Sequence, residues 1–232
     1  MKKVNQWDYF IRKVSFAMYA FYLTNKHGFS LKKAKTIQDK TNGRFLYCKQ
    51  MASTLGLTIE STGIENIENG KQYIIAINHR SVLDPVIADI ALNKKLPGFW
   101  IAKKELSKSP FFKSFVNNAG TILVDREEAS QTSFFKEIKE KVINEKSNIF
   151  IFPEGSRNKT SNSLDEFKAG LNVIALKNKL EILPIYIETP TNEVVNNAFM
   201  GKKQVIKVRI GKPLPYKTRN IKEEYQKMFD IS

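Results

Sequence analysis

Short apolar runs that alternate with helical segments set the fold class of this chain of 232 residues. The runs have the length and the β-branched content of buried strands, and turn residues or helix-period stretches separate them. We expect strands at 74–77, 99–102, 121–124, 148–152, 182–187 and 205–210, and helices at 86–92, 111–117, 130–145 and 164–179, with a further short helix in the basic tail. Residues 55–70 read as a linker or a short edge strand. This alternation predicts an α/β fold with a mostly parallel central sheet flanked by helices.

A basic, amphipathic two-helix hairpin is expected ahead of this sheet. Residues 4–24 carry an apolar stripe at helical spacing, made of Trp7, Phe10, Ile11, Val14, Ala17, Met18, Phe21 and Tyr22. Gly28-Phe29-Ser30 is expected to break the first helix, with Ser30 capping a second one that runs to about Thr54 and is weakened at Gly43. The second helix is basic through Lys32, Lys33, Lys35, Lys40, Arg44 and Lys49. We therefore divide the chain into a hairpin, residues 1–55, and an α/β domain, residues 56–232.

The charge of the chain points to an anionic partner. The formal net charge is +15, and residues 1–55 contribute +9 of it, from eleven Lys and Arg against Asp8 and Asp39. Lipid headgroups, nucleic acid and phosphorylated substrates all fit such an excess. The uncharged run 14–25 is shorter than the roughly 20 residues that cross a bilayer. The first helix of the hairpin therefore fits a helix that lies in the membrane interface. The alternative is a helix packed on the protein's own core.

The apolar run at 74–77 ends in Asn78-His79, and Asp84-Pro85 follows. We expect Asp84 to be the N-cap of the next helix, with Pro85 at its first position. His79 then lies in the loop after a strand, where open α/β sheets bind their ligands. A histidine beside a carboxylate that holds its tautomer is a minimal general base. The alternative is a polar loop histidine beside a helix cap, and these residues alone do not separate the two.

Polar residues that follow the other strands favour the catalytic alternative. Lys103-Lys104, Asp125-Arg126 and Glu154-Gly155-Ser156-Arg157 each come directly after an apolar run. In a parallel sheet, all of these strand ends meet at one edge with His79. Arg offers a fork for bidentate phosphate binding, Lys a mobile charge, and Gly155 a close approach of the backbone. A phosphate-bearing substrate is therefore expected at this edge.

In order and spacing, these segments resemble the glycerolipid acyltransferases typified by 1-acylglycerol-3-phosphate acyltransferase. The matching blocks are Asn78-His79-x4-Asp84, Gly120 followed by an apolar strand and Asp125-Arg126, Phe152-Pro153-Glu154-Gly155-Ser156-Arg157, and Leu183-Pro184-Ile185. The segment Ala102–Leu106 is also similar to the family's, and the resemblance spans about residues 73–187. The second block has Leu123 where the family often has Phe, which changes the shape of a pocket wall without removing Arg126.

The resemblance implies transfer of a fatty acyl group from a thioester to the sn-2 hydroxyl of a lysophosphatidate. It implies His79 as general base and Asp84 as the residue that orients it. Lys103, Lys104, Arg126 and Arg157 would bind the phosphate, and Glu154, Gly155 and Ser156 would contact the substrate or brace the loop.

The same resemblance implies acyl-coenzyme A or acyl-carrier protein as co-substrate, with no cofactor and no metal, and an anionic membrane surface as partner. The hairpin would attach the protein peripherally to the cytoplasmic face of the cell membrane. Two alternatives remain: the same chemistry on another lyso-lipid, and a non-catalytic basic protein that binds membrane or nucleic acid. One cysteine and two histidines make a zinc site improbable, and no nucleic-acid-binding motif is present, so no nucleic-acid partner is expected.

Overall fold

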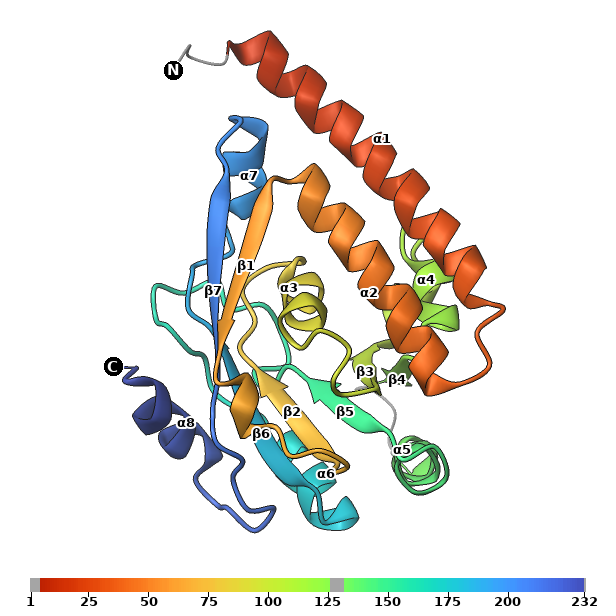
Figure 1. The fold of residues 1–232 in the computed structure, drawn as a ribbon, viewed down its shortest axis with the longest axis vertical. Helices are drawn as coiled ribbons and strands as arrows, with labels where there is room; N and C mark the ends of the chain where they lie inside the picture. Colours follow the sequence, from red (N-terminus) through yellow and green to blue (C-terminus); the bar gives the residue numbers. More distant parts are fainter. Residues whose placement is uncertain (1–4, 126–131, 232) are drawn as a thin grey trace.

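The structure, a computed structural model, describes residues 5–125 and 132–231. In that part of the chain seven strands form one sheet, in the order β1-β7-β6-β2-β5-β3-β4 (Figure 1). They are β1 (Leu57–Thr62), β2 (Tyr73–Ile77), β3 (Gly98–Lys103), β4 (Ile122–Val124), β5 (Asn148–Ile151), β6 (Glu181–Ile187) and β7 (Gln204–Ile210). Every neighbouring pair is parallel except β6 and β7, which are antiparallel. The predicted α/β class is confirmed, and β1 is the expected edge strand.

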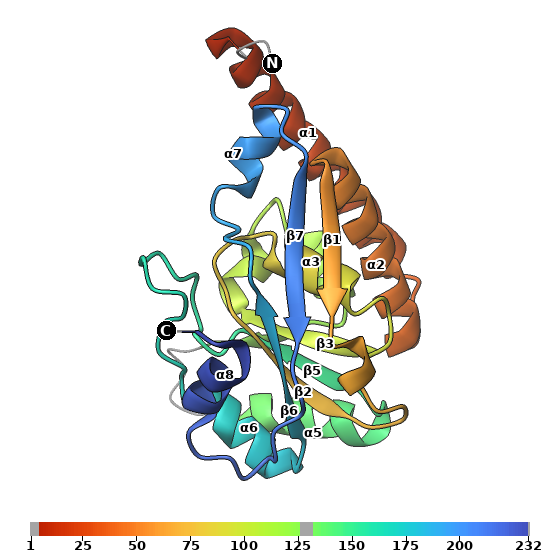
Figure 2. The same ribbon diagram turned by 60° about the vertical axis from the view of Figure 1, so that its left-hand side comes forward.

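Helices cover both faces of the sheet (Figures 1 and 2). They are α1 (Gln6–Leu31), α2 (Ile37–Thr54), α3 (Asp84–Ala91), α4 (Lys113–Asn118), α5 (Thr132–Asn144), α6 (Gly170–Asn178), α7 (Val194–Phe199) and α8 (Ile221–Phe229), with 3-10 turns η1 (Ile64–Asn66) and η2 (Lys104–Lys108). On β2, Tyr73, Ile75 and Ile77 pack with residues of α1, α2 and α3, whereas Ile74 and Ala76 pack with residues of α5 and α6. A strand buried on both faces is apolar at every position. This is why β2 could be recognised as a strand from its apolar run.

The first helix does not break where the sequence suggested. α1 continues through Gly28-Phe29-Ser30 to Leu31. A Cβ at Gly28 would lie 2.6 Å from the backbone nitrogen of Phe115, so the glycine serves close packing of α1 against the start of α4. Glycine breaks an isolated helix, but here the tertiary contact requires a residue without a side chain.

The second helix begins later than predicted and is capped by another residue. Thr36, not Ser30, is the N-cap of α2, and it forms a capping box with Asp39: the Thr36 hydroxyl accepts from the Asp39 N–H at 3.1 Å. α2 continues through Gly43, where a Cβ would lie 2.5 Å from Leu31 Cδ2 of α1. At both glycines of the hairpin, Gly28 and Gly43, a neighbouring segment packs too closely for a side chain.

A buried ion pair joins the hairpin to the sheet domain. Arg44, grouped in the sequence analysis with the exposed lysines of α2, is only 2% exposed. Its Nε lies 3.3 Å from Asp89 Oδ2 on α3, and its Nη1 donates to the Ala119 carbonyl at 3.1 Å. Trp100 Nε1 donates to the same Asp89 oxygen at 3.4 Å. Buried charges persist only when they are paired in this way, so Arg44 fixes α2 against α3 and β3.

Most of the predicted apolar stripe of α1 faces solvent, although Phe21 contacts Phe111 with ring centroids 5.7 Å apart. Its side chains are exposed to solvent: Trp7 by 74%, Phe10 by 56%, Met18 by 69% and Tyr22 by 57%. The buried side of α1 is a different one, formed by Ala20, Leu23, Thr24, Gly28 and Leu31. The first helix therefore does pack on the protein's own core, through this second side, while most of the stripe remains exposed.

The first turns of α1 extend beyond α7 at the top of the molecule (Figure 1). Within residues 5–125 and 132–231, no helix combines the length and the apolar character needed to cross a bilayer.

The helix expected at 164–179 forms only from Gly170 onward, as α6. The preceding residues use their backbone donors elsewhere: the Asp165 N–H bonds Glu154 Oε2 at 2.9 Å, and the Lys168 N–H bonds the Pro153 carbonyl at 2.8 Å. Leu164 packs in a small core cluster with Tyr225 of α8. The apolar residues that suggested a helix over 164–169, Leu164 and Phe167, pack in that cluster from a loop.

Candidate active site

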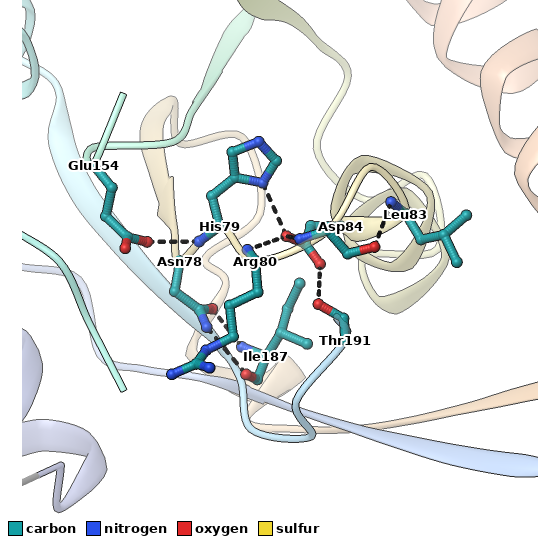
Figure 3. A network of polar contacts seen from close by, with 9 residues as sticks. Asn78, His79, Arg80, Leu83, Asp84, Glu154, Ile187 and Thr191 are labelled. Carbon is teal, nitrogen blue, oxygen red and sulfur yellow. Dashed lines mark hydrogen bonds and ion pairs between the residues drawn. The ribbon is translucent and has the colours of Figure 1, made fainter. Parts of the chain in front are cut away.

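The loop that carries His79 begins at the carboxyl end of β2 and is tied to the end of β6. Asn78 is buried, and its side-chain amide bonds the backbone of Ile187 in both directions: Nδ2 donates to the carbonyl at 3.1 Å and Oδ1 accepts from the N–H at 2.8 Å. The Asn158 N–H bonds the carbonyl of His79 at 2.7 Å. These contacts fix the direction in which His79 leaves the sheet (Figure 3).

His79 and Asp84 are in direct contact. His79 Nδ1 lies 2.9 Å from Asp84 Oδ2, and Asp84 is 1% exposed. Because a carboxylate only accepts hydrogen bonds, Nδ1 carries the proton and Nε2 of the neutral ring is left with its lone pair. Nε2 points away from Asp84 (Figure 3) and has no hydrogen-bond partner in the described part of the chain. The ring is thus held in the tautomer that a general base needs.

Asp84 does not cap α3, in contrast to the prediction. The N-cap is Leu83, and Asp84 is the first residue of the helix. Its Oδ2 accepts from the backbone N–H groups of Arg80 at 2.6 Å and Ser81 at 2.7 Å, in addition to His79. Its Oδ1 accepts from the Thr191 hydroxyl at 2.6 Å. The Asp84 side chain therefore points back toward the loop, where it accepts hydrogen bonds from His79 and from the loop backbone. It makes no hydrogen bond to the free N–H groups at the start of α3.

An aromatic stack holds the plane of the His79 ring. The ring lies on Phe152, with centroids 3.8 Å apart and planes inclined by 12°. Phe152 in turn stacks on Trp100 at 5.0 Å. The imidazole is therefore fixed by a hydrogen bond at Nδ1 and by a flat apolar surface at its face. Neither aromatic residue was singled out as part of the site from the sequence.

Glu154 braces the loop. It is 1% exposed, and both carboxylate oxygens accept backbone N–H groups: Oε1 from His79 at 2.6 Å and Oε2 from Asp165 at 2.9 Å. Burial raises the pKa of Glu154, and the hydrogen bonds from Asp165 and His79 act in the opposite direction. With both oxygens occupied, Glu154 joins the β2 loop to the loop after β5, which was one of the two roles left open by the sequence.

The predicted strand ends do meet at one edge. β2, β5, β3 and β4 are successive neighbours and all parallel, so the residues after each lie along the same edge. Lys103, Ser156 and Arg157 are exposed there, and Gly155 has a φ of 74°, in the left-handed region that favours glycine.

The other basic residues expected at this edge differ in their surroundings. Lys104 pairs with Asp125 at 3.2 Å. Strands lie about 4.8 Å apart, so Lys103 is roughly 10 Å along the edge from His79. Arg126 lies outside the described residues.

Two further residues of the site, Thr191 and Arg80, were also missed. Thr191 follows β6, the other neighbour of β2, but a threonine near a strand end is too common to mark a site. Arg80 is half-buried, and its guanidinium donates to the carbonyl of Asn162. The sequence gives no sign of that contact, because Asn162 lies in a loop far along the chain. In the described residues no group of three or more His, Cys, Asp or Glu could hold a metal ion.

Replacing Glu154 by glutamine is expected to destabilise the protein. The amide group of glutamine would have to face one of the two backbone N–H donors, which leaves a buried donor without an acceptor. We expect the free energy of unfolding to fall by about 1–3 kcal/mol, measured by chemical denaturation, with a loss of turnover because the His79 loop loosens. Glu166→Gln is the matched control, since Glu166 is 75% exposed in the same loop, and it should change stability by less than about 0.5 kcal/mol. Equal stability of Glu154→Gln and wild type would contradict the bracing role.

The chain is similar in sequence to known acyltransferases. A family model described as Acyltransferase matches residues 58–188. The chain is 34% identical over 141 residues to a 1-acyl-sn-glycerol-3-phosphate acyltransferase of Helicobacter pylori, covering 60% of this chain and 57% of the relative. It is 30% identical over 167 residues to the protein of the same name from Saccharomyces cerevisiae, covering 71% and 54%. The chain thus spans a little over half the length of these curated relatives.

A solved structure has the same fold. The crystal structure of the 1-acyl-sn-glycerophosphate acyltransferase PlsC of Thermotoga maritima matches with a TM-score of 0.72 at 19% identity, over 99% of this chain and 95% of that one. The match includes the N-terminal helix pair as well as the sheet, because it extends over nearly the whole chain.

Proposed function

Because the chain belongs to the acyltransferase family, we propose that it transfers a fatty acyl group from a thioester to the sn-2 hydroxyl of 1-acylglycerol 3-phosphate, which gives phosphatidic acid. The observation that carries this proposal is the hydrogen bond of 2.9 Å between His79 Nδ1 and Asp84, which leaves Nε2 free at an edge lined with basic residues. The names of the relatives from Helicobacter pylori and Saccharomyces cerevisiae support the choice of acceptor.

In the proposed reaction, His79 Nε2 takes the proton of the acceptor hydroxyl as that oxygen attacks the thioester carbonyl. The tetrahedral intermediate collapses, the C–S bond breaks, and the proton passes from His79 to the departing thiolate. Asp84 stabilises the imidazolium that exists between these steps. General-base catalysis of this kind contributes about 10² to 10⁴ in rate. Backbone N–H groups of the loops would stabilise the oxyanion. The thioester is already activated, so the proposed reaction requires no metal and no cofactor.

The basic residues of the sheet edge would bind the glycerol phosphate. Lys103, Arg126 and Arg157 are proposed as ligands of the phosphate, with Lys104 contributing while it pairs with Asp125 at 3.2 Å. Gly155 and Ser156 lie between Glu154 and Arg157 in the chain, at the turn where the substrate would approach the backbone. Acyl-coenzyme A and acyl-carrier protein are both proposed as donors, because both are anionic thioesters that suit a chain of charge +15.

Residues 1–55 would hold the catalytic domain, residues 56–232, at the membrane surface where the acceptor and the product reside. The exposed aromatic stripe of α1 would enter the interface, and the lysines of α2 would contact anionic headgroups, each contributing about 1 kcal/mol. The protein would then work as a peripheral protein on the cytoplasmic face of the cell membrane, with no nucleic-acid partner.

Removing the stripe is expected to weaken membrane binding. In the variant Trp7→Ala/Phe10→Ala/Met18→Ala, three exposed apolar side chains no longer enter the bilayer. The partition coefficient for vesicles of phosphatidylcholine and phosphatidylglycerol should fall by about 100-fold, as measured by co-sedimentation. The control Ile143→Ala/Leu176→Ala removes side chains that are 59% and 50% exposed on α5 and α6, and it should bind like wild type. Equal binding of the stripe variant and the control would contradict the docking role.

The acceptor is tested with a panel of lyso-lipids. Purified protein is assayed with 1-acylglycerol 3-phosphate, lysophosphatidylcholine, lysophosphatidylethanolamine and glycerol 3-phosphate, each with a coenzyme A donor and a carrier-protein donor. We expect the highest kcat/KM with 1-acylglycerol 3-phosphate. A preference for another lyso-lipid would replace the acceptor while retaining the chemistry, and a preparation that acylates none of them would refute the proposed function.

A further inference from the structure

We propose that Thr191 is a positioning residue for this reaction: its hydroxyl fixes the Asp84 carboxylate at the angle at which Asp84 can hold His79. The inference rests on the function proposed above and concerns a residue outside the four sequence blocks. Thr191 Oγ1 donates to Asp84 Oδ1 at 2.6 Å, and both residues are 1% exposed (Figure 3). An O–H···O⁻ contact of this length is a charge-assisted hydrogen bond.

The two oxygens of Asp84 have different partners. Oδ2 takes three donors, the His79 ring and the backbone N–H groups of Arg80 and Ser81. Oδ1 takes the Thr191 hydroxyl, which is its one partner among residues 5–125 and 132–231. The terminal torsion of an aspartate is soft and roughly two-fold. Contacts on one oxygen alone leave the carboxylate plane free to turn about that point, whereas a contact on the second oxygen fixes it.

Thr191 is itself firmly placed. The segment that carries it leaves β6 at Ile187, whose backbone is bonded in both directions by the Asn78 side chain. The Thr191 carbonyl accepts from the Val194 N–H at 3.3 Å as α7 begins. The loops after β2 and β6 are therefore joined twice, by Asn78 with Ile187 at the sheet edge and by Asp84 with Thr191 further out (Figure 3).

At its far end α7 rests on the hairpin. The Phe199 ring packs on Phe16 of α1 with centroids 5.4 Å apart, and Arg12 donates to the Phe199 carbonyl at 3.3 Å. Thr191 thus lies just before α7, which contacts α1, and it bonds the Asp84 carboxylate that holds His79. The hydroxyl is positioned by the body of the protein and does not depend on substrate.

The test compares Thr191→Val with Thr191→Ser. Valine keeps the shape and removes the donor, so kcat should fall by about 10- to 100-fold while KM for both substrates stays within about three-fold. Serine restores the donor and should recover kcat to within about three-fold of wild type. Thr189→Val is the matched control: the Thr189 hydroxyl accepts from the Lys207 N–H at 2.9 Å in the same segment, and its loss should leave kcat within about two-fold.

Two further readouts separate positioning from a structural role. In the Asp84→Asn background Thr191→Val should cost no more than about three-fold, because a residue that acts through Asp84 has little left to act on. The downfield proton resonance of the His79 Nδ1–H···Asp84 bond should be sharp in wild type and Thr191→Ser and broadened or lost in Thr191→Val. Wild-type kcat in Thr191→Val well below its Tm, failure of serine to restore kcat, or additive losses in the double variant would each overturn the inference. If the resonance responds as expected while wild type acylates no lyso-lipid, the proposed function fails and the positioning contact stands.

Discussion

Replacing His79 by alanine is expected to lower kcat for acyl transfer by about 10² to 10⁴. Alanine removes the Nε2 lone pair that would take the hydroxyl proton. It leaves the backbone N–H that bonds Glu154 at 2.6 Å, so the loop keeps its brace. KM for the lysophosphatidate should change by less than about three-fold, since the proposed phosphate ligands are untouched. The measurement is steady-state release of free thiol from the thioester at saturating acceptor.

The chain contains its own control for this substitution. His27 is the other of its two histidines, and its Nε2 lies 2.9 Å from the Gln50 amide oxygen, within the hairpin. His27→Ala should keep kcat within about two-fold of wild type. Similar losses from both substitutions, or full activity of His79→Ala, would show that His79 is not the base.

Asp84→Asn is expected to lower kcat by about 10⁴, the loss that the same substitution beside the catalytic histidine produces in a serine-protease triad. Asparagine fits the site: its oxygen can accept the three donors that reach Oδ2, and its amide can donate to the Thr191 oxygen. The substitution therefore removes the negative charge that stabilises the imidazolium while it leaves the packing in place. The Tm should fall only slightly as kcat falls steeply, measured by calorimetry and the thiol-release assay.

Asp89→Asn separates loss of catalysis from loss of stability. Asp89 lies on the same helix and is 7% exposed, but its partners are Arg44, Cys48 and Trp100 and do not include His79. Breaking a buried ion pair is destabilising, so this variant should melt earlier. Assayed well below its Tm, it should nevertheless keep kcat within about three-fold. A kcat for Asp89→Asn as low as that of Asp84→Asn would mean that both substitutions act through folding.

The centre of the sheet could be predicted because its strands are apolar on both faces. β2 and β6 have a strand on each side and helices on each face, so their sequences carry unbroken apolar runs.

The two N-terminal helices were predicted, but their boundaries and the role of their glycines were not. A glycine at 28 reads locally as a helix breaker, and only the contact with Phe115 explains why it lies inside α1. The buried state of Arg44 likewise depends on Asp89, which lies far from it in the chain.

The candidate site was predicted where residue type and spacing carry the chemistry. His79 and Asp84 are five positions apart, so a single loop brings them together, and their contact follows from local sequence. Thr191 contacts the same carboxylate from a separate strand end, and a threonine is too common a residue to stand out there. The bracing role of Glu154 rests on hydrogen bonds that no local pattern encodes, since one of its donors is the backbone of Asp165.

The most direct measurement follows the acyl group itself. Wild-type protein is incubated with 1-acylglycerol 3-phosphate and a thioester whose acyl chain carries ¹³C, and the products are analysed by mass spectrometry after cleavage specific for the sn-2 ester. We predict one labelled acyl chain per phosphatidic acid, located at sn-2, and one equivalent of free thiol, with formation reduced by about 10² to 10⁴ in His79→Ala. Label in free fatty acid alone, label at another position, or equal formation by His79→Ala would contradict direct acyl transfer at this site.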